Sequence, residues 1–129
     1  MAHEGLSVFQ KKWATEKYLV MAHSQAHYEA LRLLFRGNQW SCEKEVAFER
    51  LLAEAYDQAP TIKTLRTTYQ HIWGYFKKKA TTEEKERYKE LDLFLEKHVV
   101  EMHEFLRDMT RKYQPAYLVH SRIFQKDAL

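Results

Sequence analysis

Apolar residues recur every three or four positions along most of the chain, and this spacing constrains the fold more than any other feature. Between residues 88 and 109 the large apolar side chains follow the 3.6-residue period of an α-helix: Tyr88, Leu91, Leu95, Val99, Met102, Leu106 and Met109. No useful stretch alternates apolar and polar residues, and three glycines and two prolines are too few for a turn-rich β protein. The sequence therefore predicts an all-α fold, a single compact domain of five or six helices over residues 1–129.

Polar residues that can cap helices precede four of the apolar stretches: Ser24, Ser41, Thr61 and Thr81. A side-chain oxygen at such a position accepts a hydrogen bond from the first turn of the helix. Thr81 is followed three residues later by Glu84, which is the spacing of a capping box. We therefore expect helices to begin at these four residues.

Apolar spacing and helix breakers also set the limits of three helices, at about residues 6–22, 81–112 and 116–124. The second helix is expected to stop near Gly37-Asn38, because glycine and asparagine tolerate the left-handed conformation that ends helices. The helix that begins at Thr61 is expected to reach Phe76. We expect the core to include Phe76, Leu118 and Phe124.

A single cysteine, Cys42, excludes an intramolecular disulfide framework, a cysteine-based zinc finger and a self-sufficient iron–sulfur site. The longest apolar run, Tyr18-Leu-Val-Met-Ala22, is far shorter than the roughly twenty residues that a membrane span needs. The free cysteine and the lack of a secretory leader favour a cytoplasmic protein without a membrane partner.

The formal net charge of +3 hides an uneven distribution of charge. Residues 81–110 carry five basic and nine acidic side chains, whereas residues 111–129 carry four basic and one acidic. Residues 61–80 contain no acid and five bases, namely Lys63, Arg66, Lys77, Lys78 and Lys79. If the two basic segments meet in space, the fold has a positive face; otherwise the lysine run is a solvated helix end.

Histidine positions do not predict a metal site. His23 and His27 share a helix face, but the glutamate of the metalloprotease pattern is missing between them. Ser24 lies beside His23 in a helix, where adjacent side chains diverge, so the two do not form a catalytic pair. We expect no metal and no cofactor.

The stretch Tyr69–Lys79 combines aromatic side chains, His71, Gly74 and three lysines. Aromatic rings beside lysines suit RNA, because rings stack on unpaired bases while lysines meet phosphates. Gly74 lowers helix stability and indicates close approach by another backbone or a ligand. The alternative interpretation is that the rings are core residues, Gly74 allows tight helix packing and the lysines face solvent.

Three ordered motifs resemble those of a known family. They are Lys17-Tyr-Leu-Val-Met-Ala-His-Ser24 followed by Tyr28, then His71-Ile-Trp-Gly-Tyr-Phe76 followed by Lys77, and Tyr113-Gln-Pro-Ala-Tyr-Leu118 with Arg122 and Phe124 beyond it. They are similar to the YbgA-like family, a bacterial domain of unknown function that is also fused C-terminally to thiouracil and tRNA thiouridine desulfurase domains. The resemblance covers about residues 13–125. It departs at Thr67-Thr-Tyr69 and Ser121, where the family has Asn-Val-Leu and glutamine.

The resemblance implies an RNA-binding accessory module that recognises tRNA or a thiolated nucleotide and is linked to thiouridine desulfuration, without a cluster of its own. Phosphates would be neutralised by Lys17, Lys77, Lys78, Lys79 and Arg122. Tyr75 and Tyr28 would stack on a base or ribose, next to Gly74. The polar groups of the site would be His23, Ser24 and His71. The partners are then RNA and a separate desulfurase, with no DNA specificity.

Two other functions remain open at this point. A small enzyme acting on a nucleobase or nucleotide would use His23 and His71 as acid–base partners, and would need both imidazoles to face one cavity. An adaptor for a separate desulfurase would need an exposed apolar patch, expected at Trp40 or Trp73. We expect the chain not to be an enzyme on its own.

Overall fold

The computed structural model describes the backbone of residues 2–129 and the side chains from residue 5 onward. Its helices are α1 (Ala2–His23), α2 (Gln25–Leu34), α3 (Cys42–Asp57), α4 (Ile62–Trp73), α5 (Thr82–Leu93), α6 (Leu95–Tyr113) and α7 (Ala116–Val119), with short 3₁₀ helices η1 (Arg36–Asn38) and η2 (Arg122–Phe124). No strand occurs within these described residues. The predicted all-α fold is confirmed.

All four predicted caps begin helices. Ser24, Ser41, Thr61 and Thr81 each accept a hydrogen bond from the backbone N–H three residues later. The Glu84 side chain also accepts from the Thr81 backbone at 2.9 Å, which completes the predicted capping box. Helix α2 ends at Leu34, three residues before the expected stop, and the left-handed Gly37, with φ of 75°, lies inside the short helix η1 that follows.

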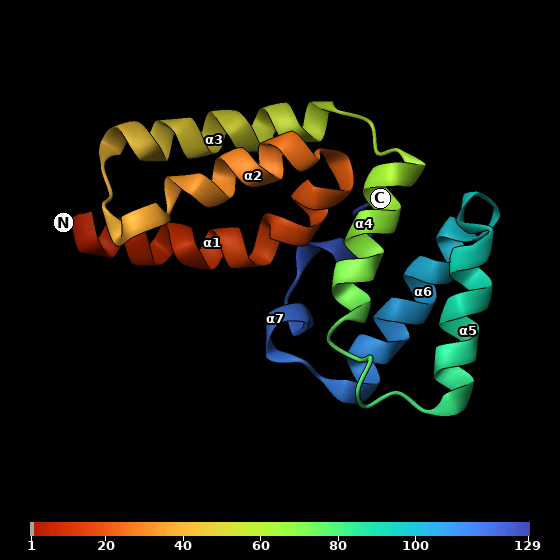
Figure 1. Ribbon diagram of the computed structural model, residues 1–129. Coiled ribbons are helices and arrows are strands. Elements are labelled where there is room, and N and C mark those ends of the chain that lie inside the picture. Colours follow the sequence, from red (N-terminus) through yellow and green to blue (C-terminus); the bar gives the residue numbers. More distant parts are fainter. Residues whose placement is uncertain (1) are drawn as a thin grey trace.

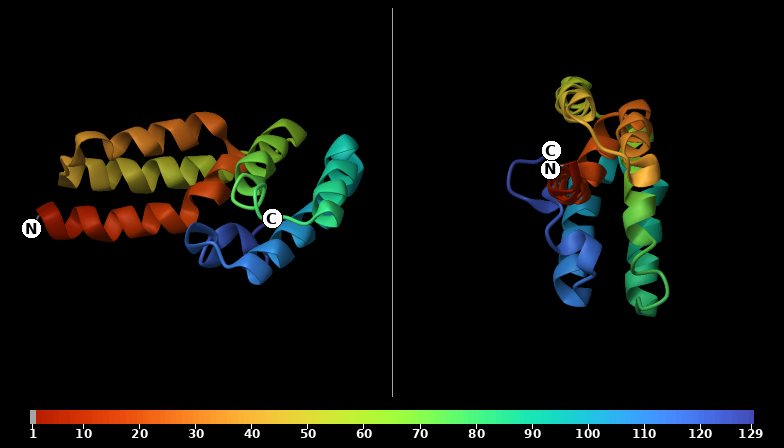
Figure 2. Two further views of the ribbon diagram at one scale, coloured as in Figure 1. Left: turned by 60° about the horizontal axis from the view of Figure 1, so that its bottom comes forward. Right: turned by 90° about the vertical axis from the view of Figure 1, so that its left-hand side faces the viewer.

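The helices form two groups that share α1 (Figures 1 and 2). The face of α1 that carries Trp13 and Val20 packs with α2 and α3 around Leu31 and Phe48. The C-terminal end of α1 joins α4, α5, α6 and α7 around a larger core that includes Met21 and Tyr69. Because α1 contributes buried side chains to both cores, it fixes the two groups relative to each other.

The long helix predicted over residues 81–112 is wrong: the chain forms two antiparallel helices instead, α5 and α6 (Figure 1). The turn is at Phe94, whose φ of −126° and ψ of 55° are not helical. The apolar spacing continues through the turn because both helices bury their apolar faces in the same core, for example at Leu91 and Leu95. No glycine or proline stands at the break, so the sequence carries no turn signal there.

Three smaller boundaries also differ from the prediction. Helix α1 begins at Ala2, well before residue 6, and α4 ends at Trp73 rather than at Phe76. The predicted helix over residues 116–124 is two short pieces, α7 and η2. Phe76 and Leu118 are fully buried as expected, whereas Phe124 is half-buried and its neighbour Ile123 takes the place in the core.

No described helix combines the length and the apolar character that crossing a bilayer requires.

Candidate nucleic-acid interface

Three tyrosines from distant parts of the chain lie next to one another, and we call Tyr18, Tyr75 and Tyr117 the tyrosine cluster. Tyr18 is its buried member and Tyr117 its exposed member. Tyr18 lies on α1, Tyr75 in the turn after α4, and Tyr117 on α7. The hydroxyls of Tyr18 and Tyr75 are 2.5 Å apart, and the ring centroids of Tyr75 and Tyr117 are 6.4 Å apart. The cluster therefore joins one residue from each of the three sequence motifs.

Lys17 lies directly against the tyrosine cluster. Its ammonium is 5.2 Å from the ring centroid of Tyr18 and 5.6 Å from that of Tyr117. Burial lowers the pKa of Lys17, and none of the described carboxylates pairs with it. Tyr117 is 65% exposed, so its ring and the neighbouring cation face solvent together. This pairing of an open aromatic ring with an uncompensated cation suits a stacked base and a phosphate.

The turn after α4 carries the exposed lysines Lys77, Lys78 and Lys79, which we call the lysine turn. None of them pairs with a carboxylate among the described side chains. Arg66 of the same acid-free segment differs, because it pairs with Asp92 at 3.3 Å. The lysine turn is therefore a patch of uncompensated positive charge.

The two basic segments, residues 61–80 and 111–129, lie next to each other in the fold, which was the condition given above for a positive face. The Phe76 and Tyr113 ring centroids are 5.9 Å apart, and the Tyr113 hydroxyl lies 3.4 Å from the Lys79 carbonyl oxygen. The tyrosine cluster adds the contact between Tyr75 and Tyr117. The lysine turn and the third motif thus lie side by side.

Arg122, which was predicted to bind a phosphate, forms an ion pair with Glu16. Its Nη1 donates to both carboxylate oxygens of Glu16, at 3.0 and 2.9 Å, and the hydroxyl of Tyr56 donates to the same carboxylate. Glu16 is only 8% exposed. The Arg122 guanidinium also lies 5.2 Å from the Tyr56 ring centroid, and its hydrogen bond to Glu16 raises the pKa of Arg122. The positive charge of Arg122 therefore pairs with Glu16 and holds η2 against α1.

His23 and Ser24 make local contacts at the end of α1. His23 Nδ1 donates to the backbone carbonyl of Gln58 at 2.8 Å, and its ring packs edge-on against Tyr56. Ser24 caps α2 and lies 2.8 Å from His27 Nδ1. These bonds hold α1, α2 and the end of α3 together. Among the described residues, no three His, Cys, Asp or Glu side chains are grouped so that they could bind a metal ion.

His71 and Gly74 are exposed on the outer side of α4. A Cβ at Gly74 would meet the backbone oxygen of His71 at 3.1 Å and no atom of another helix within 4 Å. The prediction that another backbone approaches Gly74 is therefore wrong, and the surface above it is open. Tyr28 is half-buried and packs on Trp13, with ring centroids 5.5 Å apart.

The two imidazoles proposed as catalytic partners have different surroundings. His23 contacts Gln58 and Tyr56, whereas His71 is exposed near the end of α4. The described structure has one hollow beside α6 and another between α2 and α4, and neither His23 nor His71 lines either of them.

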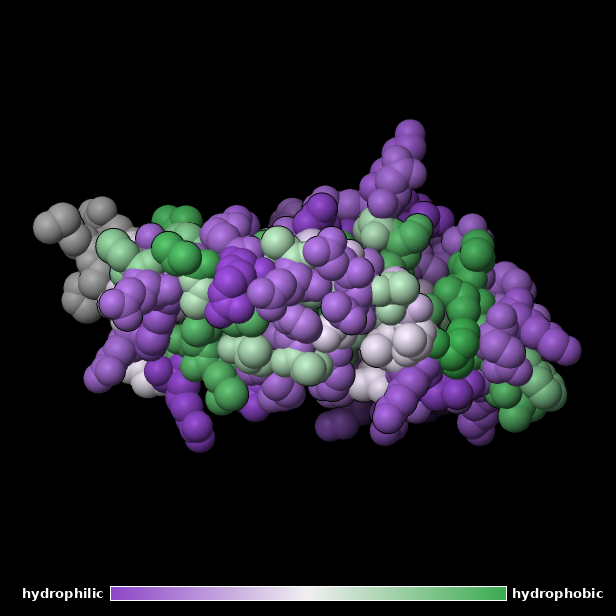
Figure 3. Space-filling view, turned by 90° about the horizontal axis from the view of Figure 1, so that it is seen from above, coloured by the Kyte–Doolittle hydropathy of each residue, from purple (hydrophilic) through white to green (hydrophobic). Residues whose placement is uncertain are grey.

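The apolar patch expected at Trp40 or Trp73 is not found at Trp73, and Trp40 is half-buried. Trp73 is 9% exposed and stacks on Tyr88 with ring centroids 4.4 Å apart, and Trp40 stacks on Phe35. Exposed apolar side chains instead occur around the α5–α6 turn, at Leu93, Phe94 and Val100. Figure 3 shows apolar surface at the end of the molecule that carries these two helices.

Four residues that contact the predicted site residues were not singled out from the sequence: Glu16, Tyr18, Tyr56 and Tyr117. Tyr18 and Tyr117 stand inside the recognised motifs, so the motifs were a signal for both. Glu16 directly precedes the first motif, and its burial beside a cation is a tertiary property. No sequence feature marks Tyr56.

The fold and this surface define an all-α domain with a tyrosine–lysine face. The family described as a protein of unknown function, DUF1722, matches residues 17–127, a range that includes all three motifs. The chain belongs to this family. No curated protein and no solved structure matches the chain.

Proposed function

We propose that this domain is an RNA-binding module. The observation that carries the proposal is the meeting of Lys17 and the exposed Tyr117 ring beside the lysine turn. Stacking on an aromatic ring requires an unpaired base, and uncompensated lysines attract phosphates. A single-stranded or looped RNA segment satisfies both requirements.

In this proposal the predicted site residues have different tasks. Lys17 and the lysine turn neutralise phosphates, while the exposed ring of Tyr117, with Tyr75 beside it, stacks on a base. His71 is the exposed polar group next to the open surface of Gly74, so it contacts a base edge or ribose hydroxyl. His23, Ser24, Tyr28 and Arg122 instead make the contacts within the fold described above.

The class of RNA follows from the resemblance to the YbgA-like domain of thiouridine desulfurases. On that basis we propose that the ligand is tRNA or a thiolated nucleotide within it. Cys42 is the single cysteine of the chain, so the chain lacks the ligands for an iron–sulfur cluster. In this proposal the domain presents tRNA to a separate desulfurase.

The test is a titration of labelled tRNA with the protein, followed by fluorescence anisotropy. Replacing Lys77, Lys78 and Lys79 together by Ala is expected to weaken binding about tenfold or more at low salt. The matched control replaces Lys85, Lys89 and Lys97, three exposed lysines of α5 and α6, and so removes the same charge elsewhere. Equal affinities of the two triple variants would overturn the proposed surface.

A second titration compares thiolated with unthiolated tRNA on the wild-type chain. Tighter binding of the thiolated form is expected if the domain recognises the modified base. Equal binding would contradict the thiolated-nucleotide part of the proposal and leave general tRNA binding.

A further inference from the structure

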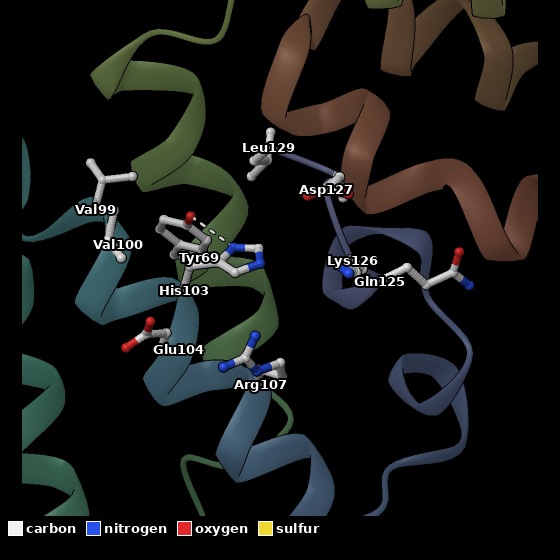
Figure 4. Close-up of a pocket in the computed structure, with 11 residues that line it drawn as sticks. Tyr69, Val99, Val100, His103, Glu104, Arg107, Gln125, Lys126, Asp127 and Leu129 are labelled. Carbon is white, nitrogen blue, oxygen red and sulfur yellow. Dashed lines mark hydrogen bonds between the residues drawn. The ribbon is translucent and has the colours of Figure 1, made fainter.

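A hollow of about 330 Å³ lies between α4, α6 and the C-terminal residues (Figure 4). The residues from α6 include Val99, Val100, His103 and Arg107, and the opposite side includes Lys126. It shares no lining residue with the tyrosine cluster or the lysine turn. A volume of this size is at the lower end of ligand pockets, which suits a small molecule.

Arg107, in the wall of this hollow, has one guanidinium nitrogen without a hydrogen-bond partner. Its Nε is buried and has no hydrogen-bond partner, and no described carboxylate pairs with the guanidinium. Arg66, which is similarly half-buried, instead pairs with Asp92. A buried N–H without an acceptor costs free energy, so an oxygen atom of a ligand that bonds to this Nε would be stabilised there.

The surroundings of Arg107 leave it accessible to a ligand. Figure 4 shows the guanidinium turned toward the His103 ring, while the Glu104 carboxylate points away from it. Burial and then the charge of Arg107 lower the pKa of His103, whose Nδ1 lies 3.2 Å from the Tyr69 hydroxyl. The neutral imidazole does not compete with Arg107 for an anion.

We propose that this hollow binds a small organic anion, with its carboxylate or phosphate group on Arg107 and Lys126 and its apolar part against Val99 and Val100. The planar guanidinium of arginine matches two oxygens of such a group. The two valines supply an apolar wall at one end of the same hollow.

The experiment titrates the ¹⁵N- and methyl-labelled chain with sodium benzoate and, separately, with phenyl phosphate. Benzyl alcohol, which has the ring but no charge, is the matched control. Benzoate or phenyl phosphate is expected to shift the Arg107 Nε–H signal and the methyl signals of Val99 and Val100, with Kd of order 1 mM for so small a probe. The tighter of the two probes identifies the preferred oxyanion.

Variants test whether the guanidinium binds the probe. Arg107→Gln is expected to weaken binding of the anion about tenfold. Arg107→Lys keeps the charge but loses the planar guanidinium, so its affinity should lie between those of Arg107→Gln and the wild type. Arg111→Gln removes the same charge from an exposed position on α6 outside the hollow and should bind as wild type does. Equal shifts with benzyl alcohol, no shifts with either anion, or unchanged affinity in both Arg107 variants would overturn the proposal.

Discussion

The two basic segments of this chain differ in what their cations contact. In residues 111–126 three of the four cations pair with acids: Arg111 with Asp108, Lys112 with Glu84 and Arg122 with Glu16. In residues 61–80 only Arg66 does so, and the lysine turn pairs with no described carboxylate. The later segment therefore places most of its cations in ion pairs within the fold, whereas the earlier one leaves most of its cations unpaired.

The largest expected effect is on stability, from Arg122→Ala. This change leaves the Glu16 carboxylate buried with the Tyr56 hydroxyl as its remaining partner, and we expect a loss of about 2 kcal/mol in the free energy of unfolding. Urea denaturation measures it. The double variant Glu16→Gln with Arg122→Met removes both charges and should recover part of the loss. A loss below about 0.5 kcal/mol in the single variant would contradict a structural role for the pair.

A smaller effect is expected on RNA binding from Tyr117→Ala. Loss of one stacking ring should weaken tRNA binding about tenfold, since stacking is worth about 1–3 kcal/mol per base. Tyr117→Phe keeps the ring and should bind nearly as wild type. The exposed ring contributes little to stability, so the melting temperature should change little. If Phe is as damaging as Ala, the hydroxyl is the important group and stacking is the wrong explanation.

Acid sensitivity tests the paired segment in another way. Burial alone would raise the pKa of Glu84, but hydrogen bonds from Lys112, Tyr113 and the Thr81 backbone lower it to about 2. A carboxyl with a lowered pKa stabilises the fold above its ordinary pKa and loses that contribution as pH falls toward the lowered value.

Glu84→Gln should therefore be less stable than wild type at neutral pH. The stability difference between the two should shrink as pH falls from about 4.5 to about 2. Thermal unfolding at a series of pH values measures this difference. A constant difference over that range would show that ionisation of Glu84 does not contribute.

The smallest expected effect on stability comes from the lysine turn. Replacing its three lysines by Ala should change the free energy of unfolding by less than about 0.5 kcal/mol per site, because surface residues without partners contribute little. The same variant should reduce the salt dependence of RNA binding, by a slope of about 2 if each lysine meets one phosphate of a single strand. A large loss of stability would erase the contrast between the two segments.

The features that sequence predicted correctly are local ones. The caps at Ser24 and Thr81 depend on residues three positions away, so their signals lie within one helical turn. The turn at Phe94 was missed because the periodicity of the apolar residues is the same on both sides of it. The pairing of Arg122 with Glu16 spans 106 positions, and no local pattern contains that contact.

The candidate site was predicted in part for the same reason. Motifs located the segments of Lys17, Tyr75 and Arg122, but they did not show which cations would be neutralised. Only the folded chain separates the paired guanidinium of Arg122 from the unpaired ammonium of Lys17. The stacking candidate Tyr117 likewise needed its exposure and its neighbours to be known.

Helix α1 has a consequence for dissecting the domain. Val20 belongs to the core with α2 and α3, while the adjacent Leu19 and Met21 belong to the core with α4 and α6. A fragment cut between α3 and α4 would expose the buried side of α1 in one half and deprive the other half of it. The two groups of helices should therefore melt in one cooperative transition, and neither should be obtained as an independently folding fragment.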